Sequence, residues 1–442
     1  MNCDLIIIGA GPGGYRAAEY AAQQGLKVVI FEAGEVGGTC LNVGCIPTKT
    51  YVHSATFAEA RERMAQVVPQ LRSGVEAILS HPNITLVRGK ASFVDAHSVC
   101  CRTTATNSTC TTGETYTAPN IVIATGSTAK LPPIEGLATD PRVVDSTGLL
   151  ALDELPRKLC IIGAGVIGME FASVFQRFGS EVTVIEFLKE CLPMVDADIA
   201  KRLRKLLEKR GITFKMKTAV QSVADIEADT ILIATGRQAN TEGLNLAAAG
   251  ITPDSRGNIP VDDNYQVSTA SPAAAPSVVL AGSPAAVHDA SPSGLYAIGD
   301  VNGRQMLAHA AEMQAVRAVN HIMGKPDGIR FDIMPAAIFT APEAACVGPS
   351  EDQLKASGTA YECHKSFWRA NGKALAMGET EGMLKLFTGA DDRILGCHAF
   401  GAHAADIIQE VSALMCRDTT LSQLLDMVHI HPTLGEILLS CS

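Results

Sequence analysis

Residues 5–32 read LIIIGAGPGGYRAAEYAAQQGLKVVIFE, and this stretch decides the fold. It predicts a buried strand, a glycine turn, a helix and a second strand in turn, over Leu5–Ile8, Gly9–Gly14, Tyr15–Gln24 and Val28–Phe31, closed by Glu32. That order is typical of a dinucleotide-binding unit, because the glycines let backbone N–H groups approach a pyrophosphate at the helix N-terminus. The closing acid accepts hydrogen bonds from ribose hydroxyls.

The pattern recurs later in the chain. It predicts a strand over Leu159–Ile162, a turn over Gly163–Gly168, a helix from about Met169 to Phe178, and a strand over Val182–Ile185 that ends at Glu186. The offset is constant, since 163 − 9 and 186 − 32 both equal 154. The sequence IATG also appears twice, ending at Gly126 and at Gly236, each time as a buried strand that enters a glycine turn. Two modules predict two dinucleotides; the alternative is one functional site beside a relic.

A pair of cysteines follows the first module. Residues 37–49 read GGTCLNVGCIPTK, with Cys40 and Cys45 five positions apart. One helical turn brings such residues to nearly one face, so their sulfurs can meet. The alternatives are a structural disulfide or half of a zinc site, although no second ligand pair at zinc spacing accompanies them. Their position just after a dinucleotide-binding unit favours a redox pair beside a flavin.

The last part of the chain, from about Phe331, has a different character. Strand-like and helical stretches alternate there, which predicts a third, α+β unit. Its end reads HIHPTLGE over residues 429–436. Because an imidazole held by a carboxylate is the arrangement of a general base, His431 and Glu436 are candidates for that role. If His431 were considered alone, it would be interpreted as a surface histidine. The presence elsewhere in the chain of a cysteine pair that needs a base favours a catalytic role for it.

The composition excludes several classes of protein. The net charge of −10 shows no excess of basic side chains that would bind nucleic acid. No apolar run is long enough to span a membrane, and no export signal precedes the first strand. The thirteen cysteines do not follow the regular spacing of a protein held together by disulfides, which indicates mostly buried thiols. We expect Cys100, Cys101 and Cys110 to be packing residues. Thiols of this kind are typical of a reducing cytoplasm. No metal site is expected.

Together these motifs resemble the pyridine nucleotide–disulfide oxidoreductases over essentially the whole chain, and within that family the dihydrolipoamide dehydrogenase branch. The resemblance implies an α/β fold with two Rossmann-like domains, one for FAD and one for NAD, and a C-terminal α+β dimerisation domain. It implies domain segments at 1–148 and 259–328 for FAD, 149–258 for NAD, and 329–442 for dimerisation. The central segment contains an Ala/Ser/Pro-rich stretch, 268–293, which is expected to be a flexible surface excursion.

The resemblance also implies a role for each site residue. FAD would be held by Gly9, Gly11, Gly14, Glu32, Gly126 and Asp300, the last through the ribityl chain, and NAD by Gly163, Gly165, Gly168, Glu186 and Gly236. Cys45 would be the thiolate beside the flavin and Cys40 the sulfur that exchanges with substrate. Lys49 would lie near the flavin, paired with Glu170. His431, oriented by Glu436, would take a proton from a dihydrolipoyl thiol.

The implied activity is oxidation of protein-bound dihydrolipoamide with reduction of NAD, in a homodimer. The partner would be the lipoyl-bearing protein of a 2-oxo acid dehydrogenase complex or of the glycine cleavage system. Two rival functions are another disulfide or metal-ion reductase of the same fold, and a flavin-binding subunit without turnover. The chain departs from the family in the 50 residues that separate Glu186 from Gly236, where a longer strand meander is usual. It departs again in the 268–293 stretch, which is normally a short turn.

Overall fold

The computed structural model describes residues 2–102, 113–268 and 294–441. The expected flexible stretch at 268–293 therefore lies outside the described residues except for Ser268, as does Cys110. The chain divides into two compact units. Unit 1 consists of Met1–Ile46, Ala65–Thr128 and Arg237–Ile329, and unit 2 of Pro47–Met64, Ala129–Gly236 and Arg330–Ser442.

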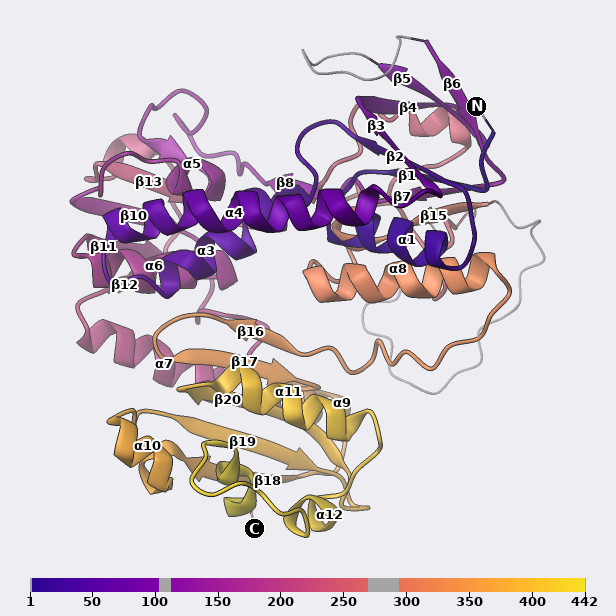
Figure 1. Ribbon diagram of the computed structural model, residues 1–442. Helices are drawn as coiled ribbons and strands as arrows, with labels where there is room; N and C mark the ends of the chain where they lie inside the picture. Colours follow the sequence, from indigo (N-terminus) through magenta and orange to yellow (C-terminus); the bar gives the residue numbers. More distant parts are fainter. Residues whose placement is uncertain (1, 103–112, 269–293, 442) are drawn as a thin grey trace. The chain divides into compact units, whose positions relative to one another are not determined.

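Unit 1 is built on a five-stranded parallel sheet in the order β15-β7-β1-β2-β3 (Figure 1). Its strands are β1 (Leu5–Ile8), β2 (Val28–Glu32), β3 (Ile84–Arg88), β7 (Asn120–Ile123) and β15 (Leu295–Ala297). Every residue of the central strand β1 is buried, as expected of a parallel strand covered on both faces. Helices α1 (Pro12–Gln23) and α8 (Ala308–Ile322) pack against each other beside this sheet.

The remaining elements of unit 1 connect these strands. A three-stranded antiparallel sheet links β3 to β7, and short elements complete the unit: β4 (Lys90–Asp95), β5 (Ser98–Arg102), β6 (Thr115–Thr117), α2 (Gly38–Val43), β8 (Ser127–Ala129), β14 (Arg237–Ala239), η2 (Leu246–Ala249) and η3 (Gly299–Asn302). Cys101 in β5 is fully buried, as expected of a packing residue, but it is disulfide-bonded and so is not a thiol. Helix α4 (Phe57–Leu79) continues through Pro69. Pro69 is exposed, so the carbonyl that it leaves unbonded can face water.

Unit 2 contains a second parallel sheet, in the order β12-β11-β10-β13-β9. Its elements are α3 (Cys45–Val52), β9 (Val143–Val144), α5 (Ser146–Leu150), β10 (Lys158–Ile162), α6 (Val166–Phe178), β11 (Glu181–Ile185), α7 (Ala197–Lys209), β12 (Thr213–Lys215), η1 (Val223–Asp225) and β13 (Thr230–Ile233). Between β12 and β13 the chain forms only the single turn η1, whereas unit 1 has an antiparallel sheet at the equivalent place. The short Glu186–Gly236 spacing therefore reflects a missing meander, while the nucleotide-binding sheet itself is whole.

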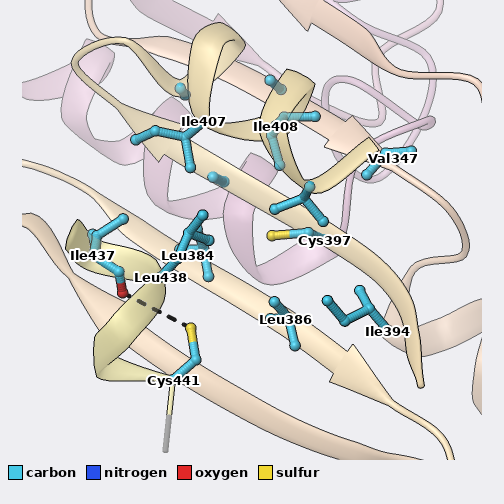
Figure 2. Packing of buried hydrophobic residues seen from close by; sticks show 14 of the residues in the cluster. Val347, Leu384, Leu386, Ile394, Cys397, Ile407, Ile408, Ile437, Leu438 and Cys441 are labelled. Atoms are coloured by element: carbon cyan, nitrogen blue, oxygen red, sulfur yellow. Dashed lines mark hydrogen bonds between the residues drawn. The ribbon is translucent and has the colours of Figure 1, made fainter. Parts of the chain in front are cut away.

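The rest of unit 2 is an antiparallel sheet in the order β16-β17-β20-β19-β18. Its elements are β16 (Ala336–Ile338), β17 (Glu343–Val347), α9 (Glu351–Ser357), β18 (Glu362–Phe367), η4 (Trp368–Ala370), α10 (Gly372–Met377), β19 (Met383–Thr388), β20 (Ile394–Gly401), α11 (Ala404–Met415), α12 (Leu421–Leu425) and η5 (Gly435–Ser440). One face of the sheet packs against α11 and η5 in a single apolar cluster (Figure 2). The cluster includes Leu384, Leu386, Cys397, Ile408 and Cys441.

These three sheets confirm the expected fold class, with two dinucleotide-binding sheets that share the order of four strands, β7-β1-β2-β3 and β13-β10-β11-β12, and an α+β unit at the C-terminus. Both nucleotide helices begin three residues earlier than the sequence pattern predicts, at Pro12 and Val166, because they start directly after the second glycine of each turn. Among the described residues, no helix is both long and apolar enough to cross a membrane.

Candidate active site

The first glycine turn presents bare backbone at the N-terminus of α1. Gly9 has a left-handed φ of 103°, and a Cβ there would lie 2.4 Å from the carbonyl oxygen of Ala124. A Cβ on Gly14 would lie 1.8 Å from the carbonyl oxygen of Gly9, so helix and strand can pack this closely only with glycine. Gly11 is the N-cap and offers no side-chain cap to the first N–H groups of α1. Those donors fit a pyrophosphate.

Glu32 closes the first turn. Its Oε2 accepts the N–H of Ala10 at 2.8 Å and its Oε1 accepts the N–H of Gly34 at 2.7 Å. Burial raises the pKa of Glu32, while these backbone hydrogen bonds oppose the rise. The carboxylate is thereby fixed across the glycine turn, at the end of β2 where the ribose of a bound dinucleotide would lie.

The second module repeats this geometry residue for residue. Gly163 has a φ of 110°, and a Cβ on it would lie 2.4 Å from the carbonyl oxygen of Ala234. A Cβ on Gly168 would lie 2.0 Å from the carbonyl oxygen of Gly163. Glu186 accepts the N–H of Ala164 at 2.6 Å and that of Leu188 at 2.7 Å, as Glu32 does in the first module. We call the glycine turn and its closing glutamate a cradle, which consists of Gly9, Gly11, Gly14 and Glu32 in the first module and of Gly163, Gly165, Gly168 and Glu186 in the second. The intact second cradle argues against a module that has lost its function.

Three more glycines complete the two cradles. Gly165 is the N-cap of α6, and a Cβ there would have no neighbour within 4 Å, so space for a ligand is open above it. Gly126 and Gly236 follow the two IATG strands and have left-handed φ values of 70° and 120°. Both modules therefore fit a dinucleotide.

The redox segment begins against the first cradle. A Cβ on Gly38 would lie 2.7 Å from the Cα of Gly11, so the start of α2 packs on the glycine turn. Cys40 lies in α2, whereas Cys45 is the first residue of α3, and Gly44 separates the two helices. The expectation of one continuous helical turn is therefore wrong. The chain instead folds back, since a Cβ on Gly44 would lie 3.3 Å from the Cα of Cys40. Cys45 is exposed and Cys40 is half-buried.

Lys49 and Glu170 form the ion pair that the resemblance implies. Nζ of Lys49 lies 2.9 Å from both carboxylate oxygens of Glu170, which is buried in α6. The carboxylate also accepts the N–H of Phe339 at 2.9 Å. The ring of Phe339 lies 4.7 Å from Lys49 Nζ, measured to the ring centroid. These contacts hold the ammonium group in place one helical turn after Cys45.

His431 and Glu436 are also brought together. Nδ1 of His431 lies 2.9 Å from Oε1 of Glu436, and Oε2 of the carboxylate accepts the N–H of Thr433 at 2.7 Å. The backbone of Thr433 and then the imidazole lower the pKa of Glu436. The imidazole side chain is 79% exposed. The pair is thus assembled with its ring open to a reactant.

Two contacts near these residues escaped the sequence interpretation. Asp300 in η3 accepts the hydroxyl of Ser127 at 2.5 Å, and Arg237 donates to that same hydroxyl oxygen at 2.6 Å. His429 donates or accepts through Nε2 at 3.0 Å from Glu410 of α11. Ser127 and Arg237 each directly follow an IATG strand, and that position was the available signal.

The predicted residues fall into both units. Cys40, Cys45 and the first cradle belong to unit 1, and Lys49, the second cradle and His431 to unit 2. Within the described residues, no group of three or more His, Cys, Asp or Glu side chains is arranged to hold a metal ion. Chemically, the chain offers two dinucleotide cradles, a dithiol pair, a fixed cation and an imidazole–carboxylate pair.

Comparisons with known proteins identify the family to which the chain belongs. Residues 3–315 match the family model for pyridine nucleotide-disulphide oxidoreductases, and residues 334–440 match its dimerisation domain. Dihydrolipoyl dehydrogenases from Pisum sativum and Chlamydia muridarum are 36% and 35% identical over 98% of this chain and over 89% and 95% of their own lengths. A leghemoglobin reductase from Glycine max is 36% identical over 98% of this chain and 86% of its own length.

A solved structure with a similar fold is the Cu(II) complex of RclA, an HOCl-induced flavoprotein disulfide reductase from Escherichia coli. It is 30% identical, covers 100% of this chain and 99% of its own, and has a TM-score of 0.88. The family uses FAD and NAD(P), in keeping with the two cradles. The chain therefore belongs to the pyridine nucleotide-disulphide oxidoreductases.

Proposed function

We propose that this protein oxidises protein-bound dihydrolipoamide to lipoamide and reduces NAD, through a redox disulfide between Cys40 and Cys45. The observation that carries the proposal is the His431–Glu436 pair, whose open imidazole stands beside a fixed carboxylate. A dithiol substrate must lose a proton before its sulfur can attack a disulfide, and an imidazole is the usual base at neutral pH. The extent of identity to dihydrolipoyl dehydrogenases supports the same assignment.

The proposed exchange balances in protons and electrons. A substrate thiolate, formed as His431 accepts its proton, attacks Cys40 and releases Cys45 as a thiolate. The second substrate thiol then displaces Cys40 and passes its proton to that sulfur, so that lipoamide forms as the protein disulfide becomes a Cys40 thiol and a Cys45 thiolate, with the first proton on His431. FAD, when bound, supplies the two-electron chemistry that links the dithiol to NAD. The first cradle with Asp300 would hold FAD, and the second with Glu186 would hold NAD.

A homodimer is supported by the dimerisation domain and by the surface around His431. Val428 is 100% exposed and Ile430 is 80% exposed, on either side of the half-buried His429. Apolar side chains this open are typical of a surface that another chain covers. We place His431 of one chain at the cysteines of its partner. The lipoyl group would arrive on a 2-oxo acid dehydrogenase complex or a glycine cleavage protein. A cytoplasmic location is part of the same proposal.

A metal-ion reductase of the same fold is the rival function. Reductases of that kind carry a cysteine pair at the C-terminus, so the state of Cys441 separates the two functions. Here Cys441 is fully buried in the apolar cluster, where burial raises its pKa to about 11 (Figure 2). A protonated thiol in that environment is a poor metal ligand. This favours the lipoamide function.

A steady-state assay separates the alternatives. We expect NADH formation from dihydrolipoamide and NAD to have a kcat/KM far above that of any other dithiol with NAD. The reverse arm measures NADH oxidation with oxidised glutathione or with Cu(II) as the acceptor. A higher kcat/KM for either acceptor than for lipoamide would contradict the proposal, and a flavoprotein without any turnover would favour the non-catalytic subunit.

A further inference from the structure

The C-terminal end of α3 is held by a single guanidinium group from α6. Nη2 of Arg177 donates to the carbonyl oxygens of Tyr51, Val52 and Ser54 at 3.0, 2.6 and 3.3 Å. The last carbonyls of a helix have no partner within the helix and need one from outside. The Ser54 side chain supplies one more by bonding the carbonyl of Thr50 at 2.8 Å. Arg177 is therefore the main outside partner of this helix end.

The same face of α6 holds α3 at a second point. Glu170 lies two helical turns before Arg177 and binds Lys49. Between them, Phe175 packs against the fully buried ring of Tyr51, with 6.5 Å between centroids. An ion pair, an aromatic contact and a helix cap thus fix α3 along α6. Burial lowers the pKa of Arg177, although a guanidinium stays charged at all ordinary pH.

The C-terminal end of α3 matters because Cys45 is the first residue of the same helix. Helix α3 has eight residues, so its two ends lie only ~12 Å apart. A helix N-terminus favours a negative charge, and a cation at the C-terminus stabilises the aligned dipoles and the last turn. A short helix that frays at its C-terminus loses much of that effect at its N-terminus.

We infer that Arg177 is a positioning residue that helps to keep Cys45 as a thiolate by capping the helix that Cys45 begins. Arg177 acts through α3 and does not touch the reacting sulfurs. The inference rests on the proposed redox role of Cys45. Loss of the cap raises the pH at which the Cys45 thiolate forms, because it removes both a cation and helical order.

The test uses the FAD-bound holoenzyme with Cys40→Ser, so that Cys45 cannot form the redox disulfide. The long-wavelength absorption between thiolate and oxidised flavin is recorded against pH for the parent, Arg177→Met and Arg177→Lys. We expect the midpoint to rise by about 0.3–0.7 pH unit in Arg177→Met. Arg177→Lys should fall between the two, since an ammonium keeps the charge but reaches fewer carbonyls.

Arg142 supplies a matched control. It also donates to three backbone carbonyls, those of Val223, Ile226 and Ala228, but in a loop remote in sequence from α3. Arg142→Met should leave the midpoint unchanged even if it lowers thermal stability. If Arg177→Met does not fold, the Arg177→Lys shift alone decides.

Two outcomes count against the inference. A midpoint equal to that of the parent in a folded, FAD-bound Arg177 variant overturns it, and so does an equal rise in Arg142→Met. Failure of the proposed redox role of Cys45 gives a different result, because then even the parent shows no thiolate absorption at any pH.

Discussion

Nδ1 of His431 lies 2.9 Å from Oε1 of Glu436, and the hydrogen bonds to this carboxylate lower its pKa. An ionised carboxylate only accepts hydrogen bonds, so Nδ1 must be the donor. In the neutral imidazole the lone pair is then on Nε2, which is the atom able to take a proton. Glu436 thus selects the tautomer that a base requires.

Replacing the base should abolish most turnover. We expect His431→Gln to lower kcat with dihydrolipoamide by about 100- to 10,000-fold, the usual contribution of a positioned base. Glu436→Gln should cost less, because the ring remains but its tautomer is no longer fixed. FAD content, measured by absorption, is the control. Wild-type turnover in His431→Gln with full FAD would contradict this role.

Nucleotide choice should follow Glu186. Its carboxylate is fixed by the N–H groups of Ala164 and Leu188, and a fixed negative charge repels a 2′-phosphate. We expect the wild type to prefer NAD to NADP, and Glu186→Ala to shift kcat/KM toward NADP. Both constants come from initial rates with saturating dihydrolipoamide. Equal kcat/KM for the two nucleotides in the wild type would refute the assignment.

A buried ammonium should stabilise unit 2. Lys385 is 1% exposed, and its Nζ lies 2.7 Å from Asp196 and 2.6 Å from Glu351. Removing the cation leaves two carboxylates facing each other, which typically costs ~3–5 kcal/mol. We expect a loss of that size for Lys385→Met in urea unfolding. Lys365, its exposed cross-strand neighbour, is the control, and an equal loss in Lys365→Met would contradict the account.

The ion pairs around Lys385 should also limit the stability of unit 2 in acid. Hydrogen bonds from Lys355 and Lys385 lower the pKa of Glu351 to about 2. Because this folded-state pKa lies below the unfolded value, the stabilisation is present above the unfolded pKa and is lost as pH falls toward 2. We expect Glu351→Gln to flatten the fall in stability between about pH 5 and about pH 3. Parallel acid curves for variant and wild type would disprove it.

Subunit exchange should restore activity to two inactive variants. If each site combines Cys45 of one chain with His431 of the other, a mixed dimer of Cys45→Ser and His431→Ala contains one intact site. We expect turnover to reappear on mixing, in proportion to the mixed dimers counted by native mass spectrometry. Mixed dimers that remain inactive would show that each chain builds its own site.

The sequence was most informative where backbone geometry dictates residue type. Gly9 and Gly163 tolerate no side chain, so both cradles were predictable from glycine spacing alone. The pairing of His431 with Glu436 was predictable because the two lie close in sequence. Helix starts at Pro12 and Val166 were missed, because the glycines of each turn, joined by proline in the first, obscure the helical pattern there.

Long-range contacts were beyond sequence reasoning. Nothing local to Arg177 indicates that it caps the end of α3, since the carbonyls it binds lie more than 120 positions away. The break at Gly44 was missed because spacing alone does not separate one helix from two. Lys385 is a charged residue in a strand, and only its long-range ion pairs with Asp196, the N-cap of α7, and Glu351 of α9 show that it is a buried, paired cation.

The most direct test of the redox disulfide is anaerobic two-electron reduction of the purified holoenzyme, followed by absorption. We expect wild type to develop a long-wavelength band from the Cys45 thiolate and oxidised flavin. Cys45→Ser should lose the band, and Cys40→Ser should show it without reduction, because its Cys45 cannot form the redox disulfide and is already available as a thiolate. A wild-type protein that binds FAD but shows no such band, or a Cys45→Ser variant that retains it, would contradict the assignment of Cys40 and Cys45.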